Sequence, residues 1–331
     1  MLLPLPGGPE TLLILLLALL VDAAVGDSRL LDRMLPTPGA LAADATRWAD
    51  KRLNRIDRTD GARRLRGTLL AIVLALAALA AGAAITVLAR FAPWGWAIEL
   101  LVVTRAIAIR KPWAGLRDVL VALDTGGVDA GRDAVAPLTD RQSWSLDLHG
   151  VVRAGAEATA RDLDRRVVGP ILWYVLLGLP GLLLWSAVDG MGRVIGHATP
   201  RHVHFGRTAA TLVRLLGWLP ARLTVVLIAA AALFVPRAAG WPALRAAVRF
   251  APAHPAGNAA WPMAAFAGAL GLALGGPRRE GDRTVSEPWL GDGRARAMPK
   301  DLRPALVLFH VAVIVAAALV AGAGLLALRF L

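Results

Sequence analysis

The chain has 331 residues, of which 56% are hydrophobic, and it carries a formal net charge of +13 without a single cysteine. The missing cysteines exclude disulfides, thiolate metal sites and cysteine nucleophiles. Charged residues stand in blocks between long apolar runs, which predicts an integral membrane protein whose positive charge reflects topology and contact with anionic lipid, not nucleic acid.

Six apolar runs approach the roughly 20 residues that a helix needs to cross the hydrocarbon core. They are Leu12–Val25, Leu69–Leu88, Trp94–Ile109, Val167–Ala187, Leu212–Val235 and Ala305–Leu328. We take six as an upper limit and expect an all-α, polytopic helical bundle that forms a single integral membrane domain over 1–331. The first run is expected to be a retained helix and not a signal peptide, because no basic residue precedes Leu12.

Arginine and lysine are concentrated in three stretches, 28–67, 110–166 and 277–303. Basic loops stay preferentially on the cytoplasmic side of a membrane. The sequence therefore predicts a multi-pass protein of the bacterial inner membrane with these three stretches in the cytoplasm.

The loop 188–211 conflicts with this topology, because it is also basic and would lie outside if 167–187 and 212–235 both cross. Re-entry of one of these runs, helped by Pro180 and Pro220, is the competing arrangement. The sequence leaves both open.

Two of the basic stretches contain helical patterns. In 28–67, Leu41, Trp48, Leu53 and Ile56 recur at helical spacing between basic residues, which predicts an amphipathic helix on the cytoplasmic leaflet.

In 110–166, apolar residues from Trp113 to Leu123 recur at three- and four-residue steps, and Gly126-Gly127 is expected to end that helix. A second helix is predicted from Ser145 to Arg166.

The segment 254–303 combines a broken apolar piece with a basic loop. His254, Asn258, Trp261 and two prolines interrupt an otherwise apolar run. At membrane depth an unpaired backbone group costs several kcal/mol, so such a segment needs protein or a wet cavity around it. Because intramembrane polar residues are functional by default, we predict that His254 and Asn258 are catalytic and that Trp261 anchors the segment or contacts substrate.

Two acids outside this segment are further catalytic candidates. Asp27 follows the first apolar run, where it could coordinate a cation or simply mark the interface. Glu157 has Arg153 four residues before it and Arg161 four after, so an ion-pair ladder on one helix face explains it equally well.

Several basic side chains could bind the anionic groups of a substrate, since arginine pairs well with phosphate and carboxylate. The candidates are Arg66, Arg105, His197, Arg201 and Arg222.

A set of motifs in order along the chain resembles the adenosylcobinamide-phosphate synthase family of cobalamin biosynthesis. These are integral membrane proteins that join aminopropanol, or its phosphate, to the free carboxyl of cobyric acid. The densest matches are Gly196-His197-Ala198-Thr199-Pro200-Arg201, Trp218-Leu219-Pro220-Ala221-Arg222-Leu223-Thr224, the block from Asn258 to Ala265, and Pro288-Trp289-Leu290-Gly291-Asp292-Gly293.

The resemblance implies an ATP-dependent, amide-forming ligase with ATP and Mg²⁺ as cofactors and Asp27, Glu157 and Asp162 as metal ligands. It also implies a corrinoid substrate, aminopropanol or its phosphate as second substrate, and other cobalamin-assembly membrane enzymes as partners.

The chain departs from the family pattern at several acids. Asp140-Arg141-Gln142-Ser143 stands where the family typically has Gly-Arg-Asp-Thr, and Arg161 and Arg165 stand where it has acids in a Glu-Asn-x-x-Asp pattern. Arginine in place of a carboxylate reverses the local field that a cation would meet. The alternative hypothesis is therefore a catalytically inactive paralogue that binds a corrinoid or scaffolds cobalamin enzymes at the membrane.

Overall fold

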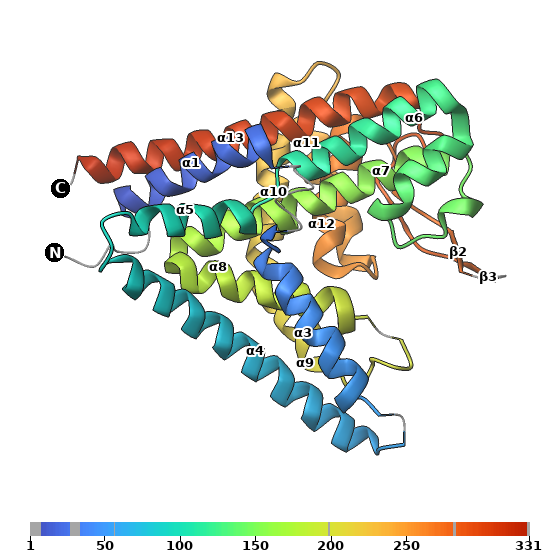
Figure 1. Ribbon diagram of the computed structural model, residues 1–331. Coiled ribbons are helices and arrows are strands. Elements are labelled where there is room, and N and C mark those ends of the chain that lie inside the picture. Colours follow the sequence, from blue (N-terminus) through green and yellow to red (C-terminus); the bar gives the residue numbers. More distant parts are fainter. Residues whose placement is uncertain (1–7, 27–33, 56, 198, 281–282, 330–331) are drawn as a thin grey trace. The chain divides into compact units, whose positions relative to one another are not determined.

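The computed structural model describes residues 8–26, 34–55, 57–197, 199–280 and 283–329. These residues are predominantly helical, which confirms the predicted all-α class (Figure 1). They divide into two compact units: residues 1–108, 169–218 and 320–331 form the first, and residues 109–168 and 219–319 the second. A single membrane domain made of both units stays a prediction.

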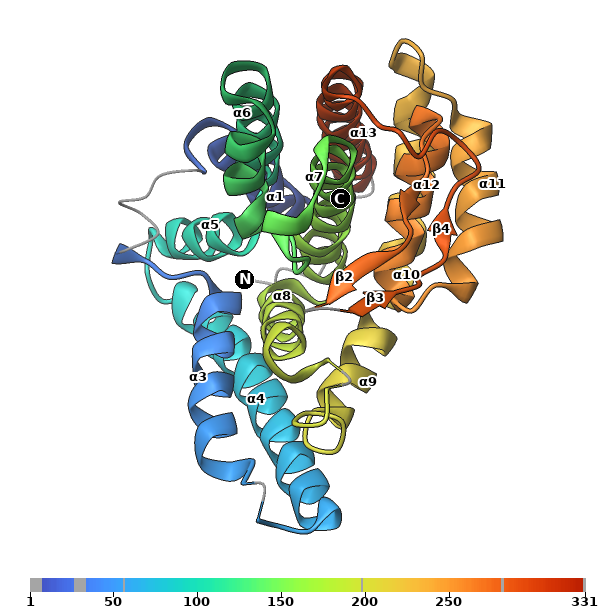
Figure 2. The same ribbon diagram turned by 90° about the vertical axis from the view of Figure 1, so that its right-hand side faces the viewer.

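The helices of the first unit are α1 (Pro9–Val25), α3 (Pro38–Leu53), α4 (Asp60–Ala89), α5 (Gly95–Ala106), α8 (Gly169–Ile195) and α9 (Arg207–Leu216). Threonine caps begin two of them: the Thr37 hydroxyl accepts the Ala40 amide at 3.1 Å, and the Thr59 hydroxyl accepts the Ala62 amide at 3.3 Å. α3 and α4 converge at the loop that joins them (Figures 1 and 2). The predicted amphipathic helix thus exists as α3, whereas Ile56 lies outside the described residues.

The core of this unit lies where α8 meets α4, α9 and the turn that precedes α9. Fully buried Val188, Met191 and Ile195 of α8 pack there with Phe205. Gly67 of α4 is pressed so closely onto this turn that an added Cβ would lie 1.8 Å from the Phe205 carbonyl oxygen.

α8 reverses direction at Gly178, whose φ of 65° is left-handed. In a straight helix Gly169 and Trp185 would be about 24 Å apart at 1.5 Å per residue. Instead, a Cβ on Gly169 would lie 2.4 Å from the Trp185 ring. The apolar run 167–187 therefore folds back on itself, and the backbone supports the re-entrant alternative for this run.

Three helical stretches of the described chain are long and apolar enough to cross a membrane: Asp60–Ala89, Leu148–Ile195 and Pro299–Leu328. A fourth is possible by the same criterion if Arg207–Leu216 and Trp218–Phe234 count as one broken span. By this criterion the described chain has fewer such stretches than the predicted upper limit of six. The run 94–109 forms only the 12-residue α5, which is about 18 Å long, whereas the hydrocarbon core of a membrane is about 30 Å thick.

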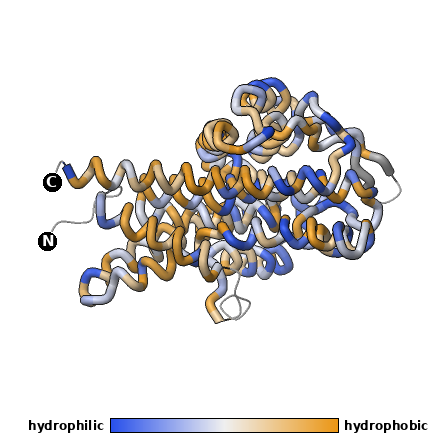
Figure 3. The backbone as a smooth tube through the Cα atoms, turned by 90° about the horizontal axis from the view of Figure 1, so that it is seen from above, coloured by the Kyte–Doolittle hydropathy of each residue, from blue (hydrophilic) through white to orange (hydrophobic). Residues whose placement is uncertain are grey.

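The second unit contains the remaining elements, except that the first residue of α10 and the end of α13 belong to the first unit. They are α6 (Arg110–Val135), η1 (Ala136–Leu138), η2 (Ser143–Ser145), α7 (Leu148–Asp162), the π-helix η3 (Leu163–Val168), α10 (Trp218–Ala231), η4 (Ala232–Phe234), α11 (Gly240–Phe250), η5 (Ala251–Ala253), η6 (Gly257–Ala259), α12 (Ala260–Leu270), β1 (Leu274–Gly275), β2 (Arg278–Glu280), β3 (Arg283–Val285), β4 (Trp289–Leu290), η7 (Pro299–Asp301) and most of α13 (Leu302–Leu328). Figure 3 shows α13, which ends near the C-terminus, as hydrophobic over most of its length.

Both predicted helices of 110–166 are present. α6 breaks at Gly127, with φ 71°, as the Gly126-Gly127 pair predicts, and the chain then turns back. An added Cβ on Gly131 would lie 2.4 Å from the Leu123 side chain, eight residues earlier. α7 begins after Asp147, whose carboxylate accepts the Gly150 amide at 2.6 Å, and η3 continues the helix to Val168.

The segment around 254–276 is broken as predicted. Two 3₁₀ turns lead into α12, which is largely buried and, at 11 residues, about 16 Å long. α12 packs closely on α11, because a Cβ on Gly268 would lie 2.3 Å from the Pro242 carbonyl oxygen (Figure 2). β1 follows and pairs antiparallel with β4, matching Leu274 with Leu290 and Gly275 with Trp289.

Candidate functional site

Glu157 of α7 is a buried acid of the second unit, with 6% of its surface exposed. Its Oε2 accepts from Arg141 Nη2 at 3.0 Å, and its Oε1 accepts the Gly275 backbone N–H at 2.8 Å. The predicted ladder with Arg153 and Arg161 is thus not its main support. A carboxylate has about four lone-pair sites, so each oxygen keeps capacity for a further donor.

One face of α7 holds the chain that follows α12. His149, Arg153 and Glu157 stand at four-residue steps and therefore lie above one another on that face. His149 Nδ1 bonds the Ala297 carbonyl at 2.9 Å, and Arg153 Nη1 donates to the Ala295 carbonyl at 2.6 Å. Three successive turns of α7 thus bind the backbone between residues 275 and 297.

His254 lies beside Gly275, whose amide binds Glu157. The histidine is 7% exposed, and a Cβ on Gly275 would lie 3.2 Å from its Nε2. Its Nδ1 accepts the Ala256 backbone N–H at 3.1 Å, so in the neutral ring Nε2 carries the hydrogen. The structure therefore brings the predicted catalytic residues Glu157 and His254 next to the same residue, Gly275.

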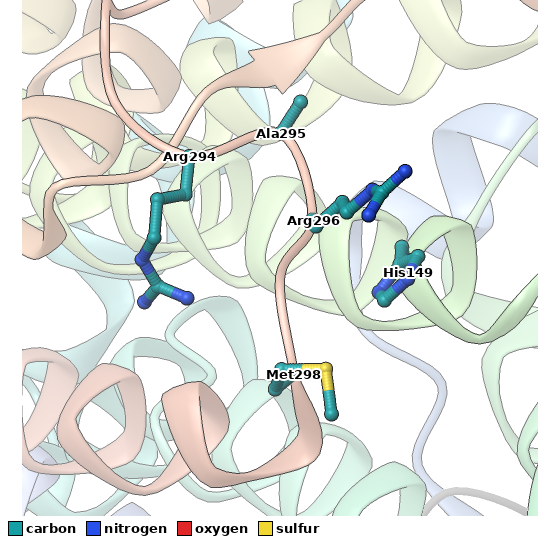
Figure 4. A pocket seen from close by; sticks show the side chains of 5 residues that line it. All are labelled: His149, Arg294, Ala295, Arg296 and Met298. Atoms are coloured by element: carbon teal, nitrogen blue, oxygen red, sulfur yellow. The ribbon is translucent and has the colours of Figure 1, made fainter.

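A cavity of about 610 Å³ opens next to this face of α7. It is lined by His149, Arg294, Ala295, Arg296 and Met298 (Figure 4). Figure 4 shows Arg296 on the same side of the segment as His149 and Arg294 on the other side. Arg294 forms an ion pair with Asp301 at 3.0 Å.

A second cluster of contacting side chains joins α10 to the broken segment 254–276. Arg222 Nη1 donates to Asn258 Oδ1 at 2.7 Å, and its guanidinium carbon lies 4.1 Å from the centre of the Trp261 ring. All three residues were predicted, and the structure brings them together. Such a stacked arginine keeps its remaining N–H groups in a fixed plane, which suits planar anions.

Asp164, which no sequence pattern singled out, lies on the π-helix η3 and is 3% exposed. It accepts from the Thr224 hydroxyl at 3.3 Å. Single-turn π segments occur frequently at functional sites, but their i→i+5 spacing leaves no recognisable pattern in one sequence.

The implied Mg²⁺ site does not fit the residues that the structure describes. Among them, no group of three or more histidine or acidic side chains could hold a metal. Glu157 binds Arg141, and Asp162 pairs with Arg166 at 3.1 Å. Asp27 lies outside the described residues.

Arg201, predicted to bind substrate, belongs to a network in the first unit. Its guanidinium pairs with Asp50 at 2.9 Å, while its carbonyl accepts from Asn54 at 3.0 Å and from Arg63 at 2.6 Å. Burial raises the pKa of Asp50, but hydrogen bonds from Asn54, Arg201 and His202 and the charge of Arg201 outweigh it, so the pKa is lowered overall. Arg201 thereby ties the turn before α9 to α3 and α4.

The other predicted anion-binding residues of this unit are spread over it. Arg105 Nε donates to the Leu35 carbonyl at 3.0 Å, and exposed His197 contacts the Arg193 carbonyl at 3.1 Å. Arg66 is half-buried on α4. Their substrate-binding roles stay predictions.

Of the arginines that stand where the family has acids, Arg161 has a defined partner, because it donates to the Leu138 carbonyl at 2.9 Å. Arg141, at a position that matches the family pattern, neutralises Glu157.

Comparison with known proteins gives one consistent result. A family profile described as "CobD/Cbib protein" matches residues 15–309. A protein named "Cobalamin biosynthesis protein CobD" from Sinorhizobium sp is 38% identical over 312 residues, which cover 93% of this chain and 97% of that protein. A protein of the same name from Brucella suis biovar 1 is 37% identical over 320 residues, covering 96% and 98%. No solved structure matches.

Proposed function

Because this chain belongs to the CobD/Cbib family, we propose that it is an amide-forming synthase that joins aminopropanol, or its phosphate, to a free carboxyl of cobyric acid. Membership and the apolar helices give it a role in cobalamin biosynthesis as a membrane protein. The reaction itself is the proposal. The observation that carries it is the buried Glu157, which binds the Gly275 amide in the chain between the family-like segments 258–265 and 288–293, while Arg153 of the same helix binds the Ala295 carbonyl just after the second segment.

The chemistry of amide formation assigns roles to these residues. The attacking amine must reach the carboxyl carbon unprotonated, and a carboxylate or imidazole within hydrogen-bond reach can take its proton. Glu157 and His254 flank Gly275 and are proposed for this step. Arg222, held by Asn258 and Trp261, is proposed to orient an anionic group of a substrate.

Activation of the carboxyl by ATP and Mg²⁺ is a prediction from the family resemblance alone. The acids among the described residues do not assemble a magnesium site. The cytoplasmic position of the basic stretches in the bacterial inner membrane, and contacts with other cobalamin-assembly enzymes, belong to the same proposal.

Complementation tests the proposal in a bacterial strain that lacks its own synthase of this kind. We expect growth on cobyric acid when the native chain is expressed, because the amide product would restore the pathway. A matched control carries Arg303→Gln, since Arg303 is exposed and lies 3.8 Å from Asp124, away from Glu157 in its contacts. Failure of a well-expressed, membrane-inserted native chain would reject the synthase and favour the inactive paralogue.

A further inference from the structure

α4 is a candidate membrane span, and only 11% of its most apolar stretch is buried within the protein. No charged residue lies between Arg66 and Arg90, which at 1.5 Å per residue are about 36 Å apart along the helix axis. At a common tilt of about 20°, their separation across the membrane is about 34 Å. The hydrocarbon core is about 30 Å thick. A crossing by α4 therefore places the two arginines just outside the core, at the headgroups of opposite leaflets.

The turn 91–96, which joins α4 to α5, carries three large exposed rings (Figure 1). Phe91, Trp94 and Trp96 have 83%, 62% and 56% of their surfaces exposed. Gly95 holds the turn against the end of α4, because an added Cβ would lie 1.7 Å from the carbonyl oxygen of the last residue of that helix. Tryptophan is enriched where hydrocarbon meets water, since its ring is amphipathic. The rings thus stand at the level where the length of α4 puts the headgroups.

Arg90, which follows the last residue of α4, brings an unbalanced charge to this turn. Its side chain has no hydrogen bond or ion pair with any described residue. Its Nε is covered by neighbouring atoms, whereas the terminal nitrogens remain open to the surroundings. Arg63, near the other end of α4, instead donates to Asn54 at 2.9 Å and to the Arg201 carbonyl at 2.6 Å. A partly covered guanidinium is normally paired, and at Arg90 the described chain supplies no anion.

We propose that the turn 91–96 binds an anionic phospholipid, with the headgroup phosphate on Arg90 and the upper acyl chains against the three rings. Guanidinium binds phosphate through charge-assisted hydrogen bonds. A lipid with a net negative charge neutralises Arg90, whereas a zwitterionic lipid carries a cation of its own. The bound lipid fixes the depth of α4 in the leaflet opposite to its basic N-terminal end. This lipid site does not depend on the proposed synthase reaction.

The test measures which lipid lies beside the turn. Because the chain has no cysteine, Leu88→Cys gives a single labelling position, and Leu88 is 66% exposed two residues before Arg90. The full chain, labelled there with bimane, is placed in phosphatidylcholine nanodiscs that contain a small fraction of nitroxide-labelled lipid. The nitroxide lies near the headgroup of either phosphatidylglycerol or phosphatidylcholine, and its quenching of bimane reports how often that lipid is the neighbour.

We expect a preference for phosphatidylglycerol of about fivefold, the effect of one basic residue at a lipid surface. Arg90→Gln should abolish this preference, whereas Arg90→Lys should keep most of it because the charge remains. Arg64→Gln is the matched control, since Arg64 is exposed near the other end of the same helix and its loss should leave the preference at residue 88 unchanged. Circular dichroism checks that each variant is folded.

Three results would overturn the lipid site. The first is equal quenching by the two lipids, or a preference that survives Arg90→Gln in folded protein. The second is stronger quenching by a nitroxide at the bilayer centre than by one near the headgroup, which would place the turn within the hydrocarbon. The third is loss of the preference when inorganic phosphate replaces chloride at constant ionic strength, which would assign Arg90 to a soluble anion.

Discussion

The substitution Glu157→Gln probes the centre of the candidate site. Glutamine keeps the shape of the side chain and an oxygen for the Gly275 amide, which now binds Oε1 at 2.8 Å. Its NH₂ group, however, would face the Arg141 guanidinium, which now donates to Oε2 at 3.0 Å. Removing one partner of a buried ion pair costs about 3 to 5 kcal/mol. Because the Arg141 side chain is 13% exposed and water can reach it, we expect about 3 kcal/mol, at the lower end of that range.

Two readouts separate the stability effect from a catalytic one. Unfolding in mixed detergent micelles should show the loss of stability, and synthesis measured on the folded fraction should fall about a hundredfold, a barrier increase of about 2.7 kcal/mol. The double variant Arg141→Gln with Glu157→Gln removes both charges and should regain most of the stability without regaining activity. Native-like stability of the single variant would refute the ion pair, and recovery of activity in the double variant would refute a catalytic role for Glu157.

Further predictions address other parts of the chain. Reporter fusions in the three basic stretches should read cytoplasmic, and an external reading at any of them would reject the topology; the fusion points are Thr59, Asp140 and Arg296. Asn258→Leu removes the acceptor of Arg222 and should abolish turnover while membrane insertion stays intact, so unchanged activity would make Asn258 structural. Since the folded-state pKa of Asp50 is lowered, its contribution to stability should be complete above the ordinary pKa of 3.8 and be lost as pH falls below it. Asp50→Asn should therefore flatten the dependence of unfolding free energy on pH in that range, and an equally steep dependence in the variant would show that the Asp50 pKa is not lowered. Gly178→Ala forces a Cβ into a left-handed turn and should lower stability by about 1 kcal/mol or more, measured by detergent unfolding, whereas a neutral effect would argue against the reversal.

Helices, and helix breaks that a glycine pair, proline or polar residue marks, could be predicted from the sequence. Gly126-Gly127 marked the break of α6, and the prolines and Asn258 marked the broken segment correctly. Gly178 gave no such signal, because a lone glycine in an apolar run looks like ordinary membrane helix until its φ is known. The pairing of β1 with β4 was also invisible, since two residues are too short for any periodicity.

The sequence predicted which residues belong to the site better than it predicted the contacts between them. Spacing on α7 pointed Glu157 towards Arg153 and Arg161, but the closest cation is Arg141, 16 residues earlier in the chain. The i,i+4 rule describes an isolated helix surface, whereas Glu157 is buried and takes its partners from tertiary packing. Asp164 was missed for the same reason, because its contact with Thr224 depends on how α10 packs.

Direct synthesis by the purified chain tests the central claim. The protein in detergent would be incubated with cobyric acid, 1-amino-2-propanol O-phosphate, ATP and magnesium, and the corrinoids would be analysed by mass spectrometry. We expect a new corrinoid whose mass equals the sum of the two substrates less one water, formed by the native chain and strongly reduced in Glu157→Gln. Unmodified cobyric acid after incubation with folded native protein, under conditions in which a related synthase gives product, would contradict it.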